Sequence, residues 1–504
     1  MFEKLEKFVF LTLIFSIPFQ KRHFLFGPAA EGENFFEWGS GFIYFTDFLI
    51  AALAIFIIAR FLRVPEELKR PLHPAGWRGL ALTAPLLALL FFSFVSLTQA
   101  DLINVGVYRF IKLAEFIFLF FYTIRYIGRI GLIATLWAFV ASGVFQSIIA
   151  ILQFAKQSSL GLEIFHESTL AIHMKGVAHI MSADGSFLVR AYGTFPSPNV
   201  LAGFLGLCLL FLFYLVVIEG RIKRKGSDHF CDFKGESLVF KIGGLKRSPP
   251  CVEQKWSDPF LFSVYVISIS LLTFGLILTF SRGTIIFLVL ISALFLAGMF
   301  LLKQFHQYRK RAKILVGLLI LSWLLVIATA WPEVSSRFLR SSYDEPAIQE
   351  RFFFNKVGIE SVRQDPMHAL FGMGIGNFVH NFKQIEPGLP EYLYQPVHNI
   401  FILIASEVGT LGFFAFVLFV ALLLEHLLKV LWTYFPNIIH ITTHMQKSDD
   451  RLSFVYAYSL LFVAFYLLFI SMYDHYFLTL QQGGLMFWIT LGLVGNVINN
   501  KLAP

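Results

Sequence analysis

The amino-acid sequence predicts an all-α polytopic membrane protein with about 12 transmembrane helices and a partly helical outer loop. The first reason is composition: 57% of the 504 residues are hydrophobic and only 14% are charged, whereas an ordinary soluble protein has roughly 25% charged residues. The second is a series of apolar runs, most of them near the roughly 20 residues that a helix needs to cross a bilayer. These features exclude a cytosolic enzyme, a disordered scaffold and a secreted disulfide framework.

The apolar runs give the expected spans in chain order. The first run follows the charged residues 1–7 and has no small-residue cleavage site, so it is predicted to be a membrane span and not a removable signal peptide. This first run is short and contains Pro18. The expected spans are 8–20, 41–62, 79–98, 105–124, 131–154, 198–218, 258–280, 283–302, 314–332, 398–424, 453–473 and 484–498.

Basic residues predict the orientation of these spans. Because Lys and Arg in short loops mark the cytoplasmic side, loops that are rich in them should face the cytoplasm. Both termini are then cytoplasmic, and the segments 155–197 and 333–397 face outside. The loops that carry most of the bases, all on one side if the spans alternate, are 61–78, 125–130, 219–257 and 303–313.

The chain is thereby divided into three parts. Residues 1–332 hold the first nine expected helices, with the outer loop 155–197 and the basic cytoplasmic loop 219–257. Residues 333–397 form the large outer loop, in which a helical pattern is followed by a glycine run and several prolines. Residues 398–504 hold the last three expected helices.

The formal net charge of +9 would suggest a nucleic-acid partner for a soluble domain. Here most bases lie in the expected cytoplasmic loops, where they set orientation and meet anionic lipid headgroups. We therefore expect membrane lipids, and no nucleic acid, as partners. The cysteines Cys208, Cys231 and Cys251 show neither metal-ligand spacing nor a disulfide pattern.

Three segments with candidate site residues are expected on the outer side. Arg190 begins the run Arg-Ala-Tyr-Gly-Thr-Phe-Pro-Ser-Pro-Asn, which leads into the sixth expected span, and Arg282 lies in a tight Phe-Ser-Arg-Gly turn between two spans. The third segment holds a Gly-Met-Gly-Ile-Gly-Asn run that ends at Asn377, followed by His398 and Asn399 at the start of a span. Together they would bring two guanidiniums and an imidazole to one membrane face.

Each of these features also has a structural explanation. An arginine at a helix end often extends to lipid headgroups, and a lone interfacial histidine is more often structural than catalytic. The glycine run is not a dinucleotide-binding fingerprint, because no strand precedes it. It is expected to let the backbone turn tightly against the membrane.

The fourth expected span carries a charged stripe. Arg109, Lys112 and Glu115 are spaced three apart, so they share one helix face. We expect Glu115 to pair with Lys112, while Arg109 lies near the outer end, where it is either part of the site or part of a buried ion pair. Glu407 is a further expected partner for one of these bases. Asp474 and His475, which follow the apolar stretch of the eleventh expected span, are weaker candidates for contact with a substrate that accepts a transferred group.

Taken in order, these motifs resemble the O-antigen ligase and O-antigen polymerase superfamily. The resemblance rests on the Arg190 segment, the Ser-Arg-Gly turn at Arg282, and the glycine run followed by His398-Asn399 and a Glu-x-Gly-x-x-Gly pattern from Glu407. It implies a GT-C-type glycosyltransferase that moves a glycan from an undecaprenyl-diphosphate carrier to an acceptor hydroxyl at the outer face of the bacterial cytoplasmic membrane. It further implies that no nucleotide sugar, cofactor or metal is needed.

The resemblance also implies roles for individual residues. Arg190 and Arg282 would hold the diphosphate, and His398 would act on the acceptor, so these three are the expected catalytic residues. Arg351 stands ahead of the glycine run, where relatives often carry a basic residue. The expected substrate-binding residues are Arg351, Asn399, Arg109 and Asn377.

The chemistry of these side chains agrees with the implied reaction. Departure of a lipid diphosphate develops negative charge on phosphate oxygens, and guanidinium forks bind such oxygens through paired, charge-assisted hydrogen bonds. The expected outer segments contain no Asp-x-Asp motif for a metal. Neutral His398 is suited to accept the proton of the attacking hydroxyl, which would invert the anomeric carbon, or else to orient the acceptor.

Several reactions share this pattern of residues. The large outer loop followed by His-Asn favours a ligase that moves a finished glycan to a glycan or lipid acceptor such as lipid A-core. The alternatives are a polymerase that moves a growing chain onto a new repeat unit and an oligosaccharyltransferase that acts on protein hydroxyls. A transporter is the candidate from a different class of protein. It is disfavoured because transporters have their binding sites near the midplane of the membrane, whereas the ionisable candidates here are expected at the outer ends of the spans.

Overall fold

The computed structural model describes residues 2–27, 37–63, 77–182, 184–231, 259–339, 346–434 and 448–499, and these are mostly helical. The helices are α1 (Phe2–Ser16), α2 (Phe45–Arg63), α3 (Trp77–Ser96), α4 (Ile103–Ile130), α5 (Leu132–Lys156), α6 (Pro198–Cys231), α7 (Pro259–Leu278), α8 (Arg282–Leu301), α9 (Arg309–Leu339), α10 (Pro346–Val362), α11 (Pro366–Phe371), α12 (Phe378–Ile385), α13 (Ile400–Tyr434), α14 (Ser448–Ser471), α15 (Tyr476–Thr479) and α16 (Gln481–Asn499). The strands are β1 (Arg22–Phe26), β2 (Gly41–Tyr44), β3 (His179–Met181) and β4 (Phe187–Val189).

The described residues contain eight helices that are long and apolar enough to cross a membrane. The number rises to nine if the bent pair Lys303–Val326 and Trp331–Arg337, whose axes meet at 93°, is one span. The prediction of a helical, multi-pass membrane protein is therefore confirmed, while the expected number of about 12 spans is not. The basic loop expected at 219–257 lies outside the described residues, apart from the end of α6.

Three expected spans form helices that do not qualify as candidate spans. The run at 8–20 belongs to α1, which has only 15 residues and ends at Ser16, two residues before the helix-breaking Pro18. The run at 105–124 belongs to α4, whose apolar surface is interrupted by the charged stripe. The run at 484–498 belongs to α16.

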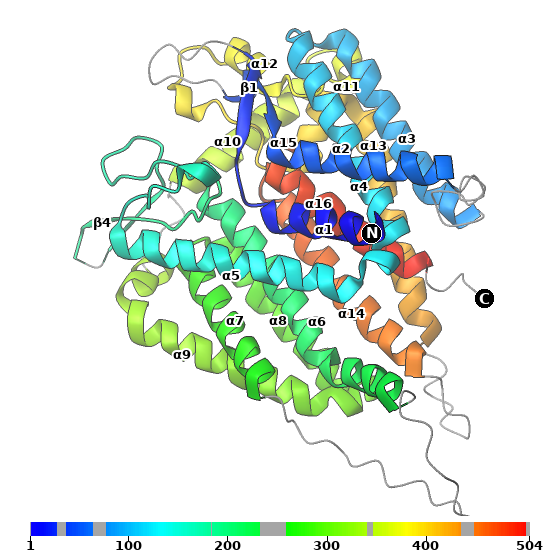
Figure 1. Ribbon diagram of the computed structural model, residues 1–504. Helices are drawn as coiled ribbons and strands as arrows, with labels where there is room; N and C mark the ends of the chain where they lie inside the picture. The colour runs from blue at the N-terminus through cyan, green and yellow to red at the C-terminus, as the bar shows by residue number, and fades with distance from the viewer. Residues whose placement is uncertain are drawn as a thin grey trace, which may run out of the picture.

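Helix α6 lies at the centre of the bundle. Residues 200–218 of its apolar part are all buried, because α5, α7, α8 and α14 pack around them. A second group forms where α13 lies along α3 and α16 lies along α4 (Figure 1). Since α6 is enclosed on all sides, the segment that leads into it is held against the other helices.

Two short hairpins depart from the all-α prediction. Strands β1 and β2 pair antiparallel, with Arg22 opposite Tyr44, and β3 and β4 pair antiparallel, with His179 opposite Val189. The second hairpin lies within the outer loop expected at 155–197. The strands have three to five residues each, which is too short for an alternating pattern to stand out from the surrounding loop.

The segment expected as the large outer loop contains the end of α9 and the helices α10, α11 and α12. It has a small hydrophobic core of its own, in which Phe354, Phe378 and Phe382 pack with Val397. Leu403 of α13 joins the same core. The loop is therefore fixed against the start of α13, which is the part of the fold that carries His398.

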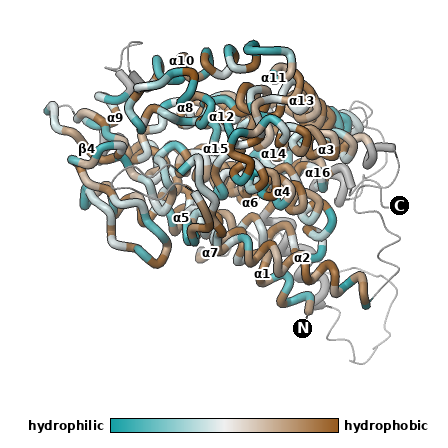
Figure 2. The backbone as a smooth tube through the Cα atoms, turned by 90° about the horizontal axis from the view of Figure 1, so that it is seen from above, coloured by the Kyte–Doolittle hydropathy of each residue, from teal (hydrophilic) through white to brown (hydrophobic). Residues whose placement is uncertain are grey.

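The hairpins and the helices of this loop lie at one end of the bundle. In Figure 1 the β3–β4 hairpin lies on the left, whereas α1 begins and α16 ends on the right. Figure 2 shows hydrophilic residues along α10 and α12, whereas α2, α3 and α13 are mostly hydrophobic. The candidate site residues lie on the side of α10 and α12.

Candidate active site

His398 lies between the outer loop and α13, enclosed by aromatic rings. Its imidazole stacks on Phe354 of α10, with ring centroids 5.5 Å apart and planes at 12°. The ring of His475, which follows α14, meets it edge-on at 4.9 Å. Its Nδ1 atom is buried and makes no hydrogen bond within the described residues. The imidazole is thus held in a fixed orientation with one nitrogen available.

His398, Asp474 and His475 form a compact polar group. One nitrogen or oxygen atom from each lies within 4.8 Å of the others, and Asp474 and His475 are only 6% and 7% exposed. The Asp474 carboxylate accepts a hydrogen bond from the backbone N–H of His475 at 2.8 Å. His475 Nδ1 is bonded to Thr479 Oγ1 at 2.7 Å. Two residues that seemed minor in the sequence are therefore direct neighbours of the expected base.

The surroundings keep both imidazoles neutral. Burial lowers the pKa of His398 to about 3; the guanidinium of Arg351 and any charge on His475 act in the same direction, and the carboxylate of Asp474 opposes them. Burial also lowers the pKa of His475, with the same opposition from Asp474 and with contributions from Arg351 and Arg109. Near neutral pH both rings therefore have a free acceptor nitrogen.

Tyr473 joins two of the expected site segments. The guanidinium of Arg351, on α10, lies over its ring at 3.9 Å from the centroid. The same ring packs on Gly283, where an added Cβ would lie 2.8 Å from it. The turn that carries Arg282 and the helix that carries Arg351 therefore meet at one aromatic side chain, next to Asp474.

Arg190 is half-buried beside the same turn. Its Nε donates to the carbonyl of Thr279 at 2.6 Å, and its Nη2 donates to Asn199 Oδ1 at 3.0 Å. Burial, together with the positive charges of Arg337 and Arg351, lowers the pKa of Arg190 to about 10. Several guanidiniums thus lie close together at this end of the bundle, an arrangement suited to a multiply charged anion.

The other expected substrate-binding residues have different positions. Asn399 caps α13, since its Oδ1 accepts from the backbone N–H groups of Phe401 and Ile402 at 2.9 and 3.2 Å. Asn377 is fully buried and accepts from the backbone N–H of Leu102 at 2.7 Å. The structure therefore brings Arg190, Arg282, Arg351 and His398 to one region, whereas Asn377 is occupied with backbone contacts.

A comparison with protein families agrees with this arrangement. Residues 267–417 match the model of the family described as O-antigen ligase. This match supports the O-antigen ligase superfamily. The match spans α8, the outer loop and the first half of α13, so it contains Arg282, Arg351 and His398. The resemblance drawn from the sequence is confirmed. A comparison with curated proteins finds no match.

The glycine run of this O-antigen ligase domain makes tight turns. Gly372, Gly374 and Gly376 have φ values of 74°, 96° and 79°, a region that side-chain-bearing residues rarely adopt. Added Cβ atoms would collide with the backbone of Glu407, with Ala100 and with the side chain of Arg109, respectively. The run therefore lets the outer loop approach the helices closely, as predicted.

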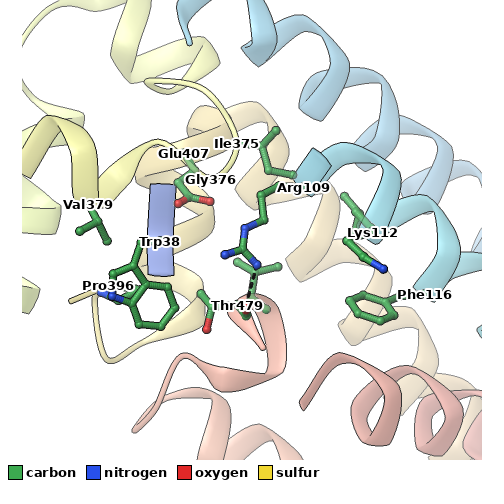
Figure 3. Close-up of a pocket in the computed structure, with 12 residues that line it drawn as sticks. Trp38, Arg109, Lys112, Phe116, Ile375, Gly376, Val379, Pro396, Glu407 and Thr479 are labelled. Carbon is green, nitrogen blue, oxygen red and sulfur yellow. Dashed lines mark hydrogen bonds between the residues drawn. The ribbon is translucent and has the colours of Figure 1, made fainter. Parts of the chain in front are cut away.

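The charged stripe on α4 is largely paired. Lys112 Nζ lies 3.0 Å from Glu115, as expected, and it also forms an ion pair with Asp47 of α2. Arg109 Nη1 instead donates to the carbonyl of Thr479 at 2.6 Å. Arg109 thus contacts the backbone of α15, which follows His475 in the chain (Figure 3).

Sequence reasoning missed Arg337 and gave too little weight to Asp474 and His475. Arg337 follows the expected span 314–332, so its outer position could have been noticed in the same way as that of Arg282. Asp474 and His475 are more than 70 residues from His398 in the sequence, and no local pattern connects them. Only the packing of α14 against α13 brings them together.

His398, Asp474 and His475 are also the group of described residues that could hold a metal ion. Neutral imidazoles and a carboxylate are common ligands for zinc and similar ions. The sequence-based expectation was that the reaction needs no metal. The two possibilities predict different responses of the activity to a chelator.

Proposed function

We propose that the protein transfers a glycan from an undecaprenyl-diphosphate carrier to an acceptor hydroxyl at the outer face of the bacterial cytoplasmic membrane. The observation that carries the proposal is the position of a neutral imidazole, His398, beside a group of guanidiniums that includes Arg190 and Arg351. A base for the acceptor and an anion site for the leaving group are the two components that this transfer requires.

The guanidiniums are suited to the leaving group. As the bond between the anomeric carbon and the phosphate oxygen breaks, negative charge grows on the diphosphate. Arg190, Arg282 and Arg351 would bind this charge through directed hydrogen bonds, each well-placed donor contributing about 3–4 kcal/mol in a site that excludes water. No metal and no nucleotide sugar enters this scheme.

His398 is placed to take the proton. In the proposed step the acceptor oxygen bonds to the anomeric carbon from the face opposite the diphosphate, so the configuration inverts. The proton of the acceptor hydroxyl passes to His398, and undecaprenyl diphosphate leaves with the electron pair of the broken bond. The carboxylate of Asp474 would stabilise the resulting imidazolium, as its opposing effect on the pKa of His398 indicates. In the alternative role, His398 only orients the acceptor.

The low pKa of His398 belongs to the protein without substrate. The positive charge of Arg351 contributes to it, and a bound diphosphate would offset that charge. The pKa of His398 then rises toward the range in which an imidazole is an effective base near neutral pH. Donor binding would in this way prepare the base.

A ligase is the proposed type, and a surface-polysaccharide polymerase or a protein O-oligosaccharyltransferase is the alternative within the same superfamily. A transporter remains the candidate from another class. The candidate residues lie at the α10–α12 end of the helix bundle, whereas transporter sites typically lie near the midplane of the membrane. With the bases on the other side, we propose that the termini are cytoplasmic and the site is periplasmic.

The decisive experiment is transfer by the purified protein. An undecaprenyl-diphosphate-linked glycan is incubated with a lipid A-core glycolipid, a second lipid-linked repeat unit or an acceptor peptide. His398→Ala and Arg190→Ala should abolish product formation with whichever acceptor works. The matched controls are His368→Ala, a histidine paired with Asp365 on α11, and Arg363→Ala, at an exposed position of the same loop. Full turnover by His398→Ala would refute the proposed site.

A further inference from the structure

Glutamine side chains hold the segment that carries Arg190. Residues 190–192 belong to no helix or strand, so their backbone groups must find partners elsewhere. The segment follows β4, and α5 ends beside the β3–β4 hairpin (Figure 1). Glutamine oxygens at the end of α5 accept from four backbone N–H groups, those of Val189, Tyr192, Gly193 and Thr194. The position of the segment therefore depends in large part on α5.

Gln153 is the central member of this group of glutamines. Its Oε1 accepts from the backbone N–H groups of Tyr192 and Gly193 at 3.1 and 2.8 Å, and its Nε2 donates to the carbonyl of Gly193 at 2.8 Å. The side chain is only 2% exposed. Because the amide both accepts from and donates to the same stretch of backbone, it fixes the orientation of that stretch as well as its distance from α5.

The Gln153 amide also reaches a second part of the outer loop. Its Nε2 donates to Glu167 Oε1 at 2.7 Å. The Glu167 carboxylate in turn accepts from the backbone N–H groups of Leu160 and Leu162 at 2.8 and 2.7 Å. One buried amide thus joins the start of the outer loop to the stretch that follows Arg190, so its loss would loosen both.

Gln146 adds a second point of attachment, further inside the helix bundle. Its Oε1 accepts from the backbone N–H of Thr194 at 2.8 Å. Gly193 has a φ value of 60°, and an added Cβ there would lie 2.5 Å from the same oxygen, so the backbone lies directly against the amide. Gln146 and Gln153 both belong to the candidate span Leu132–Lys156. Polar side chains inside a span are costly unless they are paired, and both of these glutamines bind the Arg190 segment.

The turn before α8 holds Arg190 from another direction. Arg190 Nε donates to the carbonyl of Thr279 at 2.6 Å, and the backbone N–H of Ala191 donates to the carbonyl of Leu278 at 3.1 Å. This is the turn that leads into Arg282. The Arg190 guanidinium therefore lies between a backbone fixed by α5 and the turn of the second expected diphosphate ligand. A shift of residues 192–193 would change the position of the guanidinium relative to that turn.

We infer that Gln153 is a positioning residue for Arg190, which sets where the guanidinium meets the diphosphate and does not touch the donor itself. The inference rests on the proposed function and deepens it, because the donor site then depends on α5, a helix that contains none of the expected site residues. Paired hydrogen bonds from a guanidinium to phosphate require a fixed direction. Gln153 should therefore affect binding of the donor and not of the acceptor.

The test is binding of undecaprenyl diphosphate to the purified full-length protein in detergent, which does not depend on turnover. Gln153→Met keeps the size of the side chain, removes its hydrogen bonds and should weaken binding about tenfold. Arg190→Ala should weaken binding at least as much. In the double variant, Gln153→Met should add less than about twofold to the effect of Arg190→Ala, because residues that act through one another are not additive. Gln304→Met is the matched control, since this half-buried glutamine follows the end of α8 that is remote from Arg282.

A charge exchange provides a second test that remains informative if Gln153→Met unfolds the protein. Gln153→Glu alone places a carboxylate within hydrogen-bonding distance of the Glu167 carboxylate, and the two negative charges repel. In Gln153→Glu/Glu167→Gln the two partners exchange roles, and the new carboxylate at position 153 still accepts from Tyr192 and Gly193. The double variant should bind undecaprenyl diphosphate at least about threefold more tightly than Gln153→Glu.

Transfer assays give a further readout that a purely structural role would not change. Gln153→Met should raise the KM for the donor and leave the KM for the acceptor unchanged. If Arg190→Ala weakens binding and Gln153→Met binds like the wild type, the inference is overturned and the proposed function stands. Equal losses from Gln153→Met in the wild type and in Arg190→Ala also overturn it. If Arg190→Ala itself leaves binding unchanged, the diphosphate site of the proposed function is wrong as well.

Discussion

Replacing Gly283 by alanine should damage the site through Tyr473. The added Cβ would lie 2.8 Å from the half-buried ring, whereas ordinary contacts begin at 3.4 Å, so the ring and α8 must separate by about 0.6 Å. Tyr473 is the surface on which the Arg351 guanidinium rests at 3.9 Å. Separation of the Tyr473 ring from α8 should therefore displace both the turn that carries Arg282 and the guanidinium of Arg351.

The expected magnitude follows from the sensitivity of catalysis to position. Since a misplacement of about 1 Å can reduce a rate about 100-fold, a shift near 0.6 Å should lower kcat on the order of tenfold. Helix propensity acts in the opposite direction, because alanine favours a helix over glycine by about 1 kcal/mol. Any loss therefore comes from the contact with Tyr473.

The assay is glycan transfer at saturating donor and acceptor, together with a thermal melt. Gly128→Ala and Gly317→Ala are the matched controls, because an added Cβ meets nothing within 4 Å at either position. The double variant Gly283→Ala/Tyr473→Leu should be less impaired than the sum of the single effects, as residues in contact are not additive. A Gly283→Ala protein with the kcat of the controls would refute the reasoning.

Three further predictions concern charge. The pKa of His398 is about 3 in the folded protein and roughly 6.5 in the unfolded chain, so the unfolded chain binds an extra proton at pH values between the two. The free energy of unfolding should therefore fall as the pH drops below about 6.5. In thermal melts at several pH values, His398→Gln should make this dependence on pH weaker. Lys112→Ala leaves the buried Asp47 without its cationic partner, with hydrogen bonds only from Tyr44 and Gln481 among the described residues, and should cost about 3–5 kcal/mol in unfolding experiments. The matched Lys429→Ala, whose pair with Glu425 is exposed, should cost about 0–1 kcal/mol. Transfer should survive removal of divalent ions with a chelator, and a loss restored by one added metal would instead assign His398 as a ligand.

Those features of the fold that depend on local composition could be predicted from the sequence. The long apolar runs that form α6, α8 and α13 stand out because each residue adds to the same local signal. The number of candidate spans in the structure is lower than the number expected from the sequence where an apolar run is short or interrupted, as in α1 and in the charged helix α4. Hydropathy alone does not say whether an apolar helix crosses a membrane or lies against other helices.

The site was predictable in part for the same reason. Arg190, Arg282 and His398 lie in recognisable motifs, so the sequence identified them without their contacts. Asp474 lies in a segment with no motif, and only its distance to His398 in the folded chain makes it a candidate. Positions that act through packing between remote helices leave no periodic or spacing signal in a single sequence.

The charges around the two histidines give the proposed reaction an order of events. Arg351 and Arg109 both lower the pKa of His475, and Arg351 also lowers the pKa of His398. Under the proposed function, a diphosphate bound at Arg351 would offset one of these charges, so the pKa of both imidazoles would rise. The proposed base would then accept a proton more readily after the donor has bound than before it.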